Sequence, residues 1–420
     1  MNLLVKGITV ADPNSDFNQQ NVDVRIEKGE ITSMAKNLSP IKGEQVFEGK
    51  GAVLSPGFFD LNCMIGDPGL ETKEDIESGT AAASAGGFTG LAMLPITNPI
   101  VQSKGEVAYI LNKAKGNLVD VFPIGAISKD LEGKEMAELF DMKNAGAVAF
   151  SDGSKAIADD GFMSRSLQYA LGFNSLLIVY PENKSIAGKA QVNESKNNVL
   201  LGMKGIPALA EEMQISRDIF LATYHNAPIH ISNISTAGAV ELIKKAKKDG
   251  VKVTCDVAAH QLVFTEELLN DFDSNYKVKP PLRSKADQKA LVAGLKDGTI
   301  DAISSQHRPH EIEFKDVEFE IAAYGIIALQ TVLPLLIKAG LDAQLIVEKL
   351  AINPRKLLNL TVPMIKVGAN ANFTVYHPSL EWNYNMGNNA SKANNSPLLG
   401  KTLTGKVQLV YNNKQFQTYE

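Results

Sequence analysis

Residues 52–94 read AVLSPGFFDLNCMIGDPGLETKEDIESGTAAASAGGFTGLAML. Two apolar runs, AVLSPGFFD and FTGLAML, enclose a segment at 73–85 with helical periodicity. A nearly continuous apolar strand followed by a helix and another such strand is typical of a parallel sheet buried on both faces. This stretch therefore predicts a βαβ unit and places the chain in the α/β class.

Six more apolar runs follow before residue 340: LVDVFPIGA, GAVAFS, SLLIVY, PIHIS, VKVTCDV and TIDAISS. Segments with helical periodicity lie among them, at 164–171, 237–248 and 286–295. Eight strand–helix units fit a closed (β/α)8 TIM barrel. A doubly wound open sheet is the alternative, but it usually has a Gly-rich turn after its first strand, and none is found here.

The two ends of the chain show a different pattern. Val22, Val24 and Ile26 alternate before the turn signal at Lys28-Gly29, which predicts a hairpin, and the segment from 373 to 416 alternates in the same way. We expect residues 1–52 and 364–420 to form a small composite β-sandwich beside a barrel at 53–363. The Asn-rich stretch at 383–395 is interpreted as a surface loop.

The amino-acid composition indicates which kinds of binding partner are not expected. The 420 residues are 44% hydrophobic and 21% charged, as in a globular protein, and 42 basic against 47 acidic residues give a net charge of −5. This balance argues against nucleic acid and against an anionic membrane as partner. No signal peptide or membrane-spanning stretch is recognised, and the two cysteines, Cys63 and Cys255, suit a reducing compartment. We therefore expect a cytoplasmic protein.

The first barrel strand ends in Asp60-Leu61-Asn62-Cys63-Met64, where catalytic groups of a TIM barrel are found. Further along the chain come GTAAASAGGFTG, LPITNP, GAVAFSDG, GMKGIPALAEE, IHISNISTAGAVELI, YKVKPPLRS, DGTIDAISSQHRPH and KVGANANFTVYHP. In this order, over nearly the whole chain, they resemble the dihydroorotases of the cyclic amidohydrolase family. The resemblance implies an amidohydrolase-type TIM barrel in which a zinc-activated hydroxide opens a cyclic amide in the pyrimidine pathway.

The chain departs from this family at the positions that the resemblance assigns to metal ligands and to the general base. Those positions hold Asn62, Met64, Tyr180, Asn233 and Gln306. Gln306, at the general-base position, cannot take up a proton at neutral pH. The family's substrate-binding Arg and Asn positions hold Gly66, Ile96 and Lys279. We therefore expect no bound zinc, no other cofactor and no catalytic residue.

Four polar residues at strand ends are candidates for a ligand pocket: Asp152, Lys279, His307 and Arg308. Asp152 lies near the family's bridging carboxylate and precedes Gly153, so a turn residue is the alternative interpretation. By resemblance Lys279 and Arg308 face the barrel mouth. Either they form an anion pocket, or they fill the emptied metal site and pair with Asp152, because a buried charge needs a partner.

The other histidines have simpler interpretations. His230 lies inside the sixth strand between two isoleucines, which predicts a hydrogen-bonded core histidine. His260 follows the seventh strand, where a loop role is expected. His310 is three residues after His307, and hydrogen bonding to loop backbone is favoured over metal binding.

Three functions remain open. The leading hypothesis is a non-catalytic dihydroorotase-like partner or scaffold of aspartate transcarbamoylase, because silent homologues of this family associate with that enzyme; a homo-oligomer is also expected. The alternative is an active dihydroorotase or other cyclic amidohydrolase, for which Asp152 and His307 are the best available pair. The third is a metabolite-binding regulator that uses Lys279 and Arg308.

Overall fold

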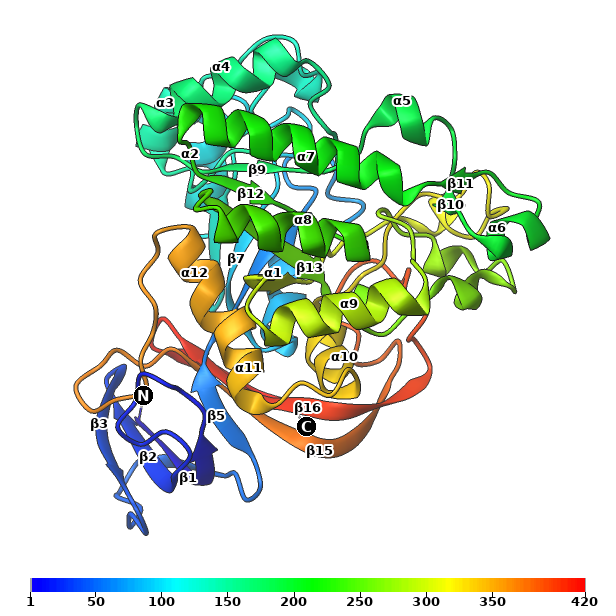
Figure 1. The fold of residues 1–420 in the computed structure, drawn as a ribbon. Helices are drawn as coiled ribbons and strands as arrows, with labels where there is room; N and C mark the ends of the chain where they lie inside the picture. The colour runs from blue at the N-terminus through cyan, green and yellow to red at the C-terminus, as the bar shows by residue number, and fades with distance from the viewer. Residues whose placement is uncertain (1, 420) are drawn as a thin grey trace.

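The computed structural model describes residues 2–419 and shows a parallel barrel beside a sheet built from both ends of the chain (Figure 1). The barrel strands are β6 (Phe58–Cys63), β7 (Phe88–Met93), β8 (Asp120–Pro123), β9 (Leu177–Val179), β12 (Ile229–Ile231), β13 (Val253–Ala258) and β14 (Ala302–Ser304). Each hydrogen-bonded pair among them is parallel. The parallel pairing confirms the predicted α/β class.

Single bridges complete the ring of strands. Phe150, in the predicted fourth strand, bridges Gly125 on one side and Leu177 of β9 on the other. The ring closes where Cys63 of β6 bridges His307, just after β14. These bridges give eight strand positions, as the sequence predicts for a TIM barrel.

Helices cover the outside of the barrel (Figure 1). They are α1 (Ile76–Ala85), α2 (Lys104–Lys113), α3 (Leu139–Ala145), α4 (Asp160–Leu171), α7 (Ala208–His225), α8 (Ala237–Lys248), α9 (Lys285–Lys296), α10 (Val332–Lys338), α11 (Ala343–Val347) and α12 (Asn353–Leu357). A short excursion after β9 contains α5 (Lys184–Ala187), β10 (Val192–Asn193), α6 (Lys196–Leu200) and β11 (Gly205–Ile206). In α8 the Thr236 hydroxyl caps the Ala239 amide, and Val240, Ile243 and Ala246 face the barrel.

The terminal strands form one hydrogen-bonded sheet of eight, in the order β17-β16-β15-β5-β1-β2-β3 with β4 also on β1. The strands are β1 (Asn2–Val10), β2 (Asn21–Glu27), β3 (Glu30–Ala35), β4 (Gln45–Glu48), β5 (Val53–Pro56), β15 (Phe373–Tyr384), β16 (Lys401–Asn412) and β17 (Gln415–Thr418). Lys28 and Gly29, with φ of 54° and 95°, make the predicted hairpin turn between β2 and β3. The sheet surrounds an apolar core of its own, which includes Leu3, Val24, Leu54, Phe373 and Leu409.

The run AVLSPGFFD, predicted as one strand, is divided between the two parts of the molecule. β5 pairs with β1 and β15 in the terminal sheet, whereas β6 starts the barrel. The chain crosses between them at Gly57, where a Cβ would lie 2.1 Å from the Thr89 hydroxyl. Only glycine allows this close approach.

The Asn-rich segment is only partly the surface loop that the sequence predicts. Residues 385–388 are exposed, but Ser391 and Asn395 are buried against the barrel. None of the helices within residues 2–419 has both the length and the apolar character needed to cross a membrane.

Candidate functional site

Asn62 and Asn233, two of the positions that resemblance assigns to metal ligands, meet at the carboxyl end of the barrel. Asn62 ends β6 and its Nδ2 donates to Ser232 Oγ at 2.9 Å. Asn233 follows β12 and its Nδ2 donates to the same hydroxyl at 3.1 Å. Both asparagines are at least 97% buried, and their side-chain amides are hydrogen-bonded to the same serine hydroxyl inside the protein.

Arg308 lies against Asn62. Its Nη2 donates to Asn62 Oδ1, and its Nη1 donates to the His307 carbonyl oxygen at 2.9 Å. Within residues 2–419 no carboxylate forms a salt bridge with this guanidinium. Burial lowers the pKa of Arg308 to about 10, and nearby anionic groups such as Asp60 and Asp256 oppose the shift. A cation thus lies against Asn62, one of the positions that the resemblance assigns to metal ligands.

Asp256, on β13, accepts hydrogen bonds from the surrounding barrel strands. Its Oδ2 accepts from Ser232 Oγ at 2.9 Å and lies 2.9 Å from His230 Nε2, and its Oδ1 accepts from Ser304 Oγ at 2.8 Å. His230 Nδ1 lies 2.9 Å from Thr254 Oγ1, so both ring nitrogens have partners. The prediction that His230 is a hydrogen-bonded core histidine is confirmed.

His260 is buried at the barrel mouth without a hydrogen bond to its ring in the described residues. It lies in a short 3₁₀ helix, η2 (Ala259–Leu262), directly after β13, and only 1% of its surface is exposed. Neither ring nitrogen has a hydrogen-bond partner in the described part of the chain. Burial, with a smaller contribution from the charge of Arg308, lowers the pKa of His260 to about 3. Its imidazole is therefore neutral at physiological pH.

The expected pairing of Asp152 with Lys279 or Arg308 is wrong. Asp152 Oδ1 accepts from the Ile127 and Ser128 amides, both at 2.9 Å, and Oδ2 accepts from the Ser128 hydroxyl. Burial nevertheless raises the pKa of Asp152 above its usual value. These donors from the third strand's loop satisfy the carboxylate locally, so no cation needs to reach it.

Lys279 has a different partner. Its Nζ lies 2.9 Å from Glu182 Oε1, and 27% of the lysine side chain is exposed. The Gln306 amide donates to the Lys279 carbonyl oxygen at 3.0 Å, which brings the general-base position to the same rim. The four candidate pocket residues therefore do not form one cluster, and ligand binding by any of them stays a prediction.

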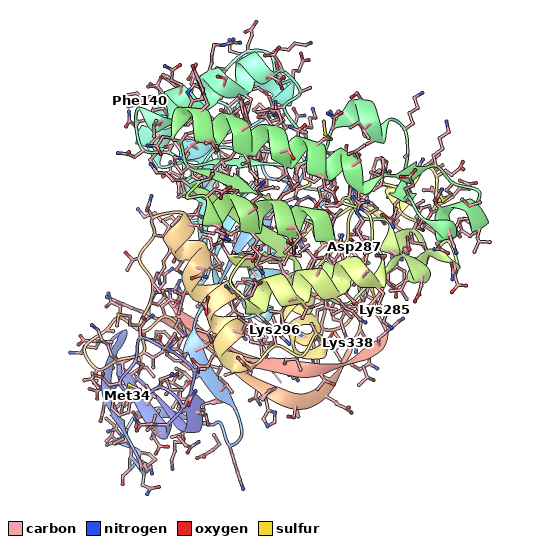
Figure 2. All side chains as sticks on the ribbon, in the orientation of Figure 1. Met34, Phe140, Lys285, Asp287, Lys296 and Lys338 are labelled. Atoms are coloured by element: carbon pink, nitrogen blue, oxygen red, sulfur yellow. The ribbon has the colours of Figure 1, made fainter. Side chains whose placement is uncertain are left out.

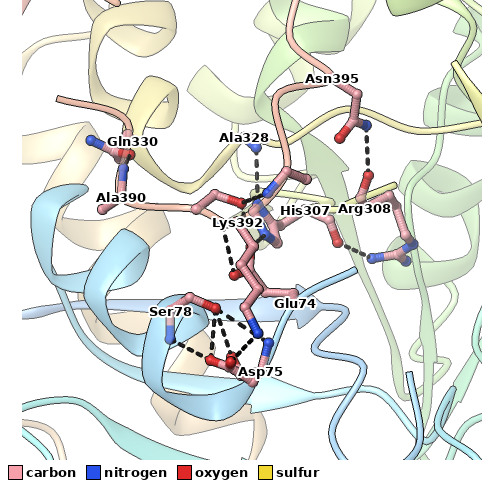
Figure 3. A network of polar contacts seen from close by, with 12 residues as sticks. Glu74, Asp75, Ser78, His307, Arg308, Ala328, Gln330, Ala390, Lys392 and Asn395 are labelled. Atoms are coloured by element: carbon pink, nitrogen blue, oxygen red, sulfur yellow. Dashed lines mark hydrogen bonds and ion pairs between the residues drawn. The ribbon is translucent and has the colours of Figure 1, made fainter. Parts of the chain in front are cut away.

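His307 belongs to a network that fastens the Asn-rich segment to the barrel (Figure 3). Its Nδ1 accepts from the Ala328 amide at 3.1 Å, and its Nε2 lies 3.4 Å from Glu74 Oε2. Glu74 also accepts from the Ser391 hydroxyl and from the Lys392 amide at 3.1 Å. Burial alone would raise the pKa of Glu74, but its bonds to His307 and Ser391 outweigh burial and hold the pKa below its usual value.

A second attachment of this segment lies beside Arg308. Asn395 Nδ2 donates to the Arg308 carbonyl oxygen at 2.9 Å and to the Gly325 carbonyl oxygen at 3.1 Å. His310 Nε2 lies 3.0 Å from the Tyr324 carbonyl oxygen, which confirms hydrogen bonding to loop backbone. Sequence reasoning missed Glu74 and Asn395, because their partners lie far away in the sequence and no local pattern marks them.

The residues at the mouth do not fit a zinc ion. Zinc prefers thiolate, imidazole and carboxylate, whereas the positions assigned by resemblance offer three amides, a thioether and a phenol, and one of the amides is bonded to the Arg308 guanidinium. Residues 2–419 contain no group of three or more His, Cys, Asp and Glu side chains placed to hold a metal ion. Burial also raises the pKa values of the Cys63 thiol and the Tyr180 hydroxyl well above their usual values, so neither supplies an anionic nucleophile.

The barrel and its terminal sheet have the fold of two solved hydantoinases. The L-hydantoinase (dihydropyrimidinase) of Arthrobacter aurescens superposes with a TM-score of 0.85 at 23% identity, over 97% of this chain and 94% of that one. The D-hydantoinase (dihydropyrimidinase) of a Thermus species gives a TM-score of 0.81 at 22% identity, over 99% and 97%. At this identity the likeness concerns the fold alone.

Sequence relatives narrow the assignment from fold to family. A family model described as dihydro-orotase-like matches residues 51–239. The dihydroorotase of Geobacter sp. (strain M21) is 42% identical over 97% of both chains, and that of Acetivibrio thermocellus is 42% identical over 96% of both. The chain belongs to the dihydroorotase family.

Proposed function

We propose that this chain is a dihydroorotase-family protein without hydrolytic activity, which acts in the cytoplasm as a partner or scaffold of aspartate transcarbamoylase in pyrimidine biosynthesis. The observation that carries the loss of activity is the contact between Arg308 and Asn62. A guanidinium next to the first ligand position repels a divalent cation, and the amide that accepts its hydrogen bond is a weak zinc donor.

Two catalytic functions that ring opening requires have no residue to perform them in this chain. Ring opening in this family depends on metal-activated hydroxide, which needs ligands that lower the pKa of bound water, and on a carboxylate that moves a proton. Gln306 stands in the place of that carboxylate and donates its amide to backbone. Since each function contributes orders of magnitude to rate, their joint loss leaves no measurable turnover.

The proposed association with aspartate transcarbamoylase is inferred from homologous proteins. Silent homologues of the family associate with aspartate transcarbamoylase, and this chain keeps eight barrel strand positions and is 42% identical to a dihydroorotase over 97% of its length. The proposed partnership therefore rests on analogy with these homologues, because the fold alone does not specify a function.

The first experiment measures metal content and turnover in protein purified without chelator. We expect substoichiometric zinc by mass spectrometry and no dihydroorotate consumption or formation. Asn62→His alone should change neither result, because Arg308 and Gln306 remain. Stoichiometric zinc would refute the loss of the metal site, and measured turnover that Asp152→Ala abolishes would favour the active cyclic amidohydrolase.

The second experiment tests the partnership separately. The chain is co-expressed with the aspartate transcarbamoylase of its own organism, and the mixture is examined by sedimentation velocity. We expect a joint species whose carbamoyl transfer activity exceeds that of the transcarbamoylase alone. Separate sedimentation of the two proteins would reject the partnership while leaving the absence of hydrolysis intact.

A further inference from the structure

A cavity of about 610 Å³ lies between the barrel and the terminal sheet. Its walls come from the first residues of β7 and β8, from residues 360–372, and from the turns at Gly29 and Lys414. Parallel barrel strands all begin on the side opposite the mouth, so this cavity is separate from the site described above. Its volume falls within the range of roughly 300–1,000 Å³ that is usual for small-molecule sites.

The walls of the cavity are fixed by hydrogen bonds between segments that are distant in the sequence. The Ala371 amide donates to the Gly29 carbonyl oxygen at 2.8 Å, and Asn372 Nδ2 donates to Asn412 Oδ1 at 3.0 Å. Asn412 Nδ2 donates in turn to the Leu118 carbonyl oxygen at 3.0 Å, close to the start of β8. These bonds join the barrel to the terminal sheet around the cavity, so the cavity is a fixed feature of the fold.

Arg355 of α12 is a buried cation in the cavity wall. Only 4% of its surface is exposed. Its Nη1 donates to the Gly57 and Ala351 carbonyl oxygens at 2.6 and 2.9 Å, and its Nη2 donates to Thr89 Oγ1 at 2.8 Å. Since a guanidinium carries five N–H groups, its Nε–H and one Nη2–H are left without an acceptor in residues 2–419. Two such neighbouring N–H groups can donate to both oxygens of a carboxylate or a phosphate.

The Arg355 guanidinium forms no salt bridge with a carboxylate in the described part of the chain. Burial lowers the pKa of Arg355 to about 9, and the charge of Asp120 opposes this shift. The Asp120 carboxylate is itself engaged, because Oδ1 accepts from Asn413 Nδ2 at 2.8 Å and Oδ2 accepts from Asn412 Nδ2 at 3.0 Å. At neutral pH Arg355 is thus a buried cation, and an anion in the cavity would offset the cost of its burial.

Two exposed lysines add positive charge to the cavity. Lys366 and Lys414 both line it, and neither forms a salt bridge within residues 2–419. The aliphatic part of Lys414 lies against the turn at Gly29, where an added Cβ would be 2.6 Å from Lys414 Cγ. With Arg355 and Asp120 included, the lining has a formal charge of +2, although the whole chain has a net charge of −5. Such a local field attracts anions.

Apolar side chains form another part of the wall. Phe122 is partly exposed and packs on the buried Phe59 ring, at 5.5 Å between ring centroids. Leu360, Val362 and Met364 line the same cavity. In small-molecule sites apolar walls cover the body of the ligand, while a few charged groups fix its orientation.

We propose that this cavity binds a small organic anion, a carboxylate or a phosphate monoester with an aromatic or apolar body. Arg355, Lys366 and Lys414 hold its oxygens, and the body lies against Phe122 and Leu360. Because the ligand contacts both the barrel and the terminal sheet, its binding stabilises the folded chain. The inference does not depend on the proposed function.

The first test measures the binding of four probes to the full-length chain by isothermal titration calorimetry in phosphate-free buffer. Phenyl phosphate and benzoate combine a ring with an anion, inorganic phosphate is an anion without a ring, and benzamide is a ring without a charge. We expect the better of the two aromatic anions to bind at least about tenfold more tightly than inorganic phosphate and benzamide. The preference between phenyl phosphate and benzoate then assigns the ligand to phosphate monoesters or to carboxylates.

The second test removes the positive charge. Lys366→Glu combined with Lys414→Glu changes the formal charge of the lining from +2 to −2 and should weaken binding of the better probe at least about tenfold. Both lysines are exposed, so the thermal midpoint of the protein without probe should change little. Arg355→Met should weaken binding further. It also removes the bond to the Gly57 carbonyl oxygen, so its folding is checked first by circular dichroism.

Lys285→Glu combined with Lys296→Glu is the matched control. Both lysines are exposed on α9 and outside the cavity, and Figure 2 shows them away from Met34 of β3, the strand that follows the turn at Gly29. This variant carries the same change of charge and should bind the probe as the wild type does.

Four results would overturn the proposal. The first is that neither aromatic anion binds at millimolar concentration. The second and third are that benzamide or inorganic phosphate binds as tightly as the aromatic anions, which would remove the need for the charge or for the apolar body. The fourth is unchanged binding to the variant with Lys366→Glu and Lys414→Glu, which would place the probe elsewhere on the protein.

Discussion

His260→Leu should change how the stability of the protein depends on pH. The imidazole is buried without a hydrogen-bond partner, and its pKa in the folded chain is about 3, against about 6.5 when unfolded. Below about pH 6.5 the unfolded chain takes up a proton at this residue and the folded chain does not, so falling pH favours unfolding. Stability contributed by the neutral ring is complete above that pH and is lost progressively toward pH 3.

The size of the effect follows from the two pKa values. Each pH unit between them is worth about 1.4 kcal/mol, so moving from about pH 7.5 to about pH 5 should cost the wild type about 2 kcal/mol through His260 alone. Leucine does not titrate and has a similar volume, and no hydrogen bond is lost. The variant should therefore lie within about 1.5 kcal/mol of wild type at neutral pH.

The assay is urea unfolding of both proteins at the two pH values, read as the difference between wild type and variant. His310, whose pKa burial lowers to about 4, and the buried carboxylates are present in both proteins and cancel in that difference. The variant should gain about 2 kcal/mol relative to wild type at the lower pH. A difference that does not vary with pH would refute the assignment of His260 as a neutral, unpartnered histidine.

Three further substitutions test the buried contacts. Arg283 Nη2 forms a salt bridge with Glu211 Oε2 of α7 at 3.4 Å, and both side chains are only 3% exposed. Arg283→Met should therefore lower the free energy of unfolding in urea by about 3 kcal/mol or more, because it leaves the Glu211 carboxylate buried without its partner; a loss below about 1 kcal/mol would contradict this. Lys279→Asn should cost less than about 1 kcal/mol in the same assay, since its ion pair is partly exposed; a loss of several kcal/mol would contradict this account of the rim. Glu74→Ala should release residues 388–396, seen as new cleavage there in limited proteolysis, whereas unchanged protection would show that other contacts hold the segment.

Local patterns in the sequence were enough to predict most of the elements. The helix predicted at 237–248 has those bounds in α8, and the one predicted at 286–295 differs from α9 by a single residue at each end. Each has an apolar side that packs on the barrel and a polar side in water, and this contrast recurs within a few residues. The division of AVLSPGFFD at Gly57 was not predicted, because the side chains that require glycine there come from distant segments.

The sequence predicted which residues lie at the barrel mouth, but it did not predict which groups they contact. Resemblance led to Asn62 and Asn233, whose amides meet at the Ser232 hydroxyl across the barrel mouth, and it directed attention to the cations nearby. It paired Asp152 with the wrong groups, since a carboxylate accepts from whichever donors the fold brings nearest, and here these are backbone amides and a serine.

The sequence by itself determined the order of strands and helices, the family, and which residues stand at the positions that the resemblance assigns to metal ligands, because these depend on local periodicity and on residue identity. Only the tertiary structure decided which partners these residues and their neighbours contact. Arg308 reaches Asn62 across 246 residues and Glu74 holds Ser391 across 317. Such contacts arise when a closed barrel brings the ends of all its strands to one rim, so their geometry is a property of the whole fold and leaves no trace in any short stretch of chain.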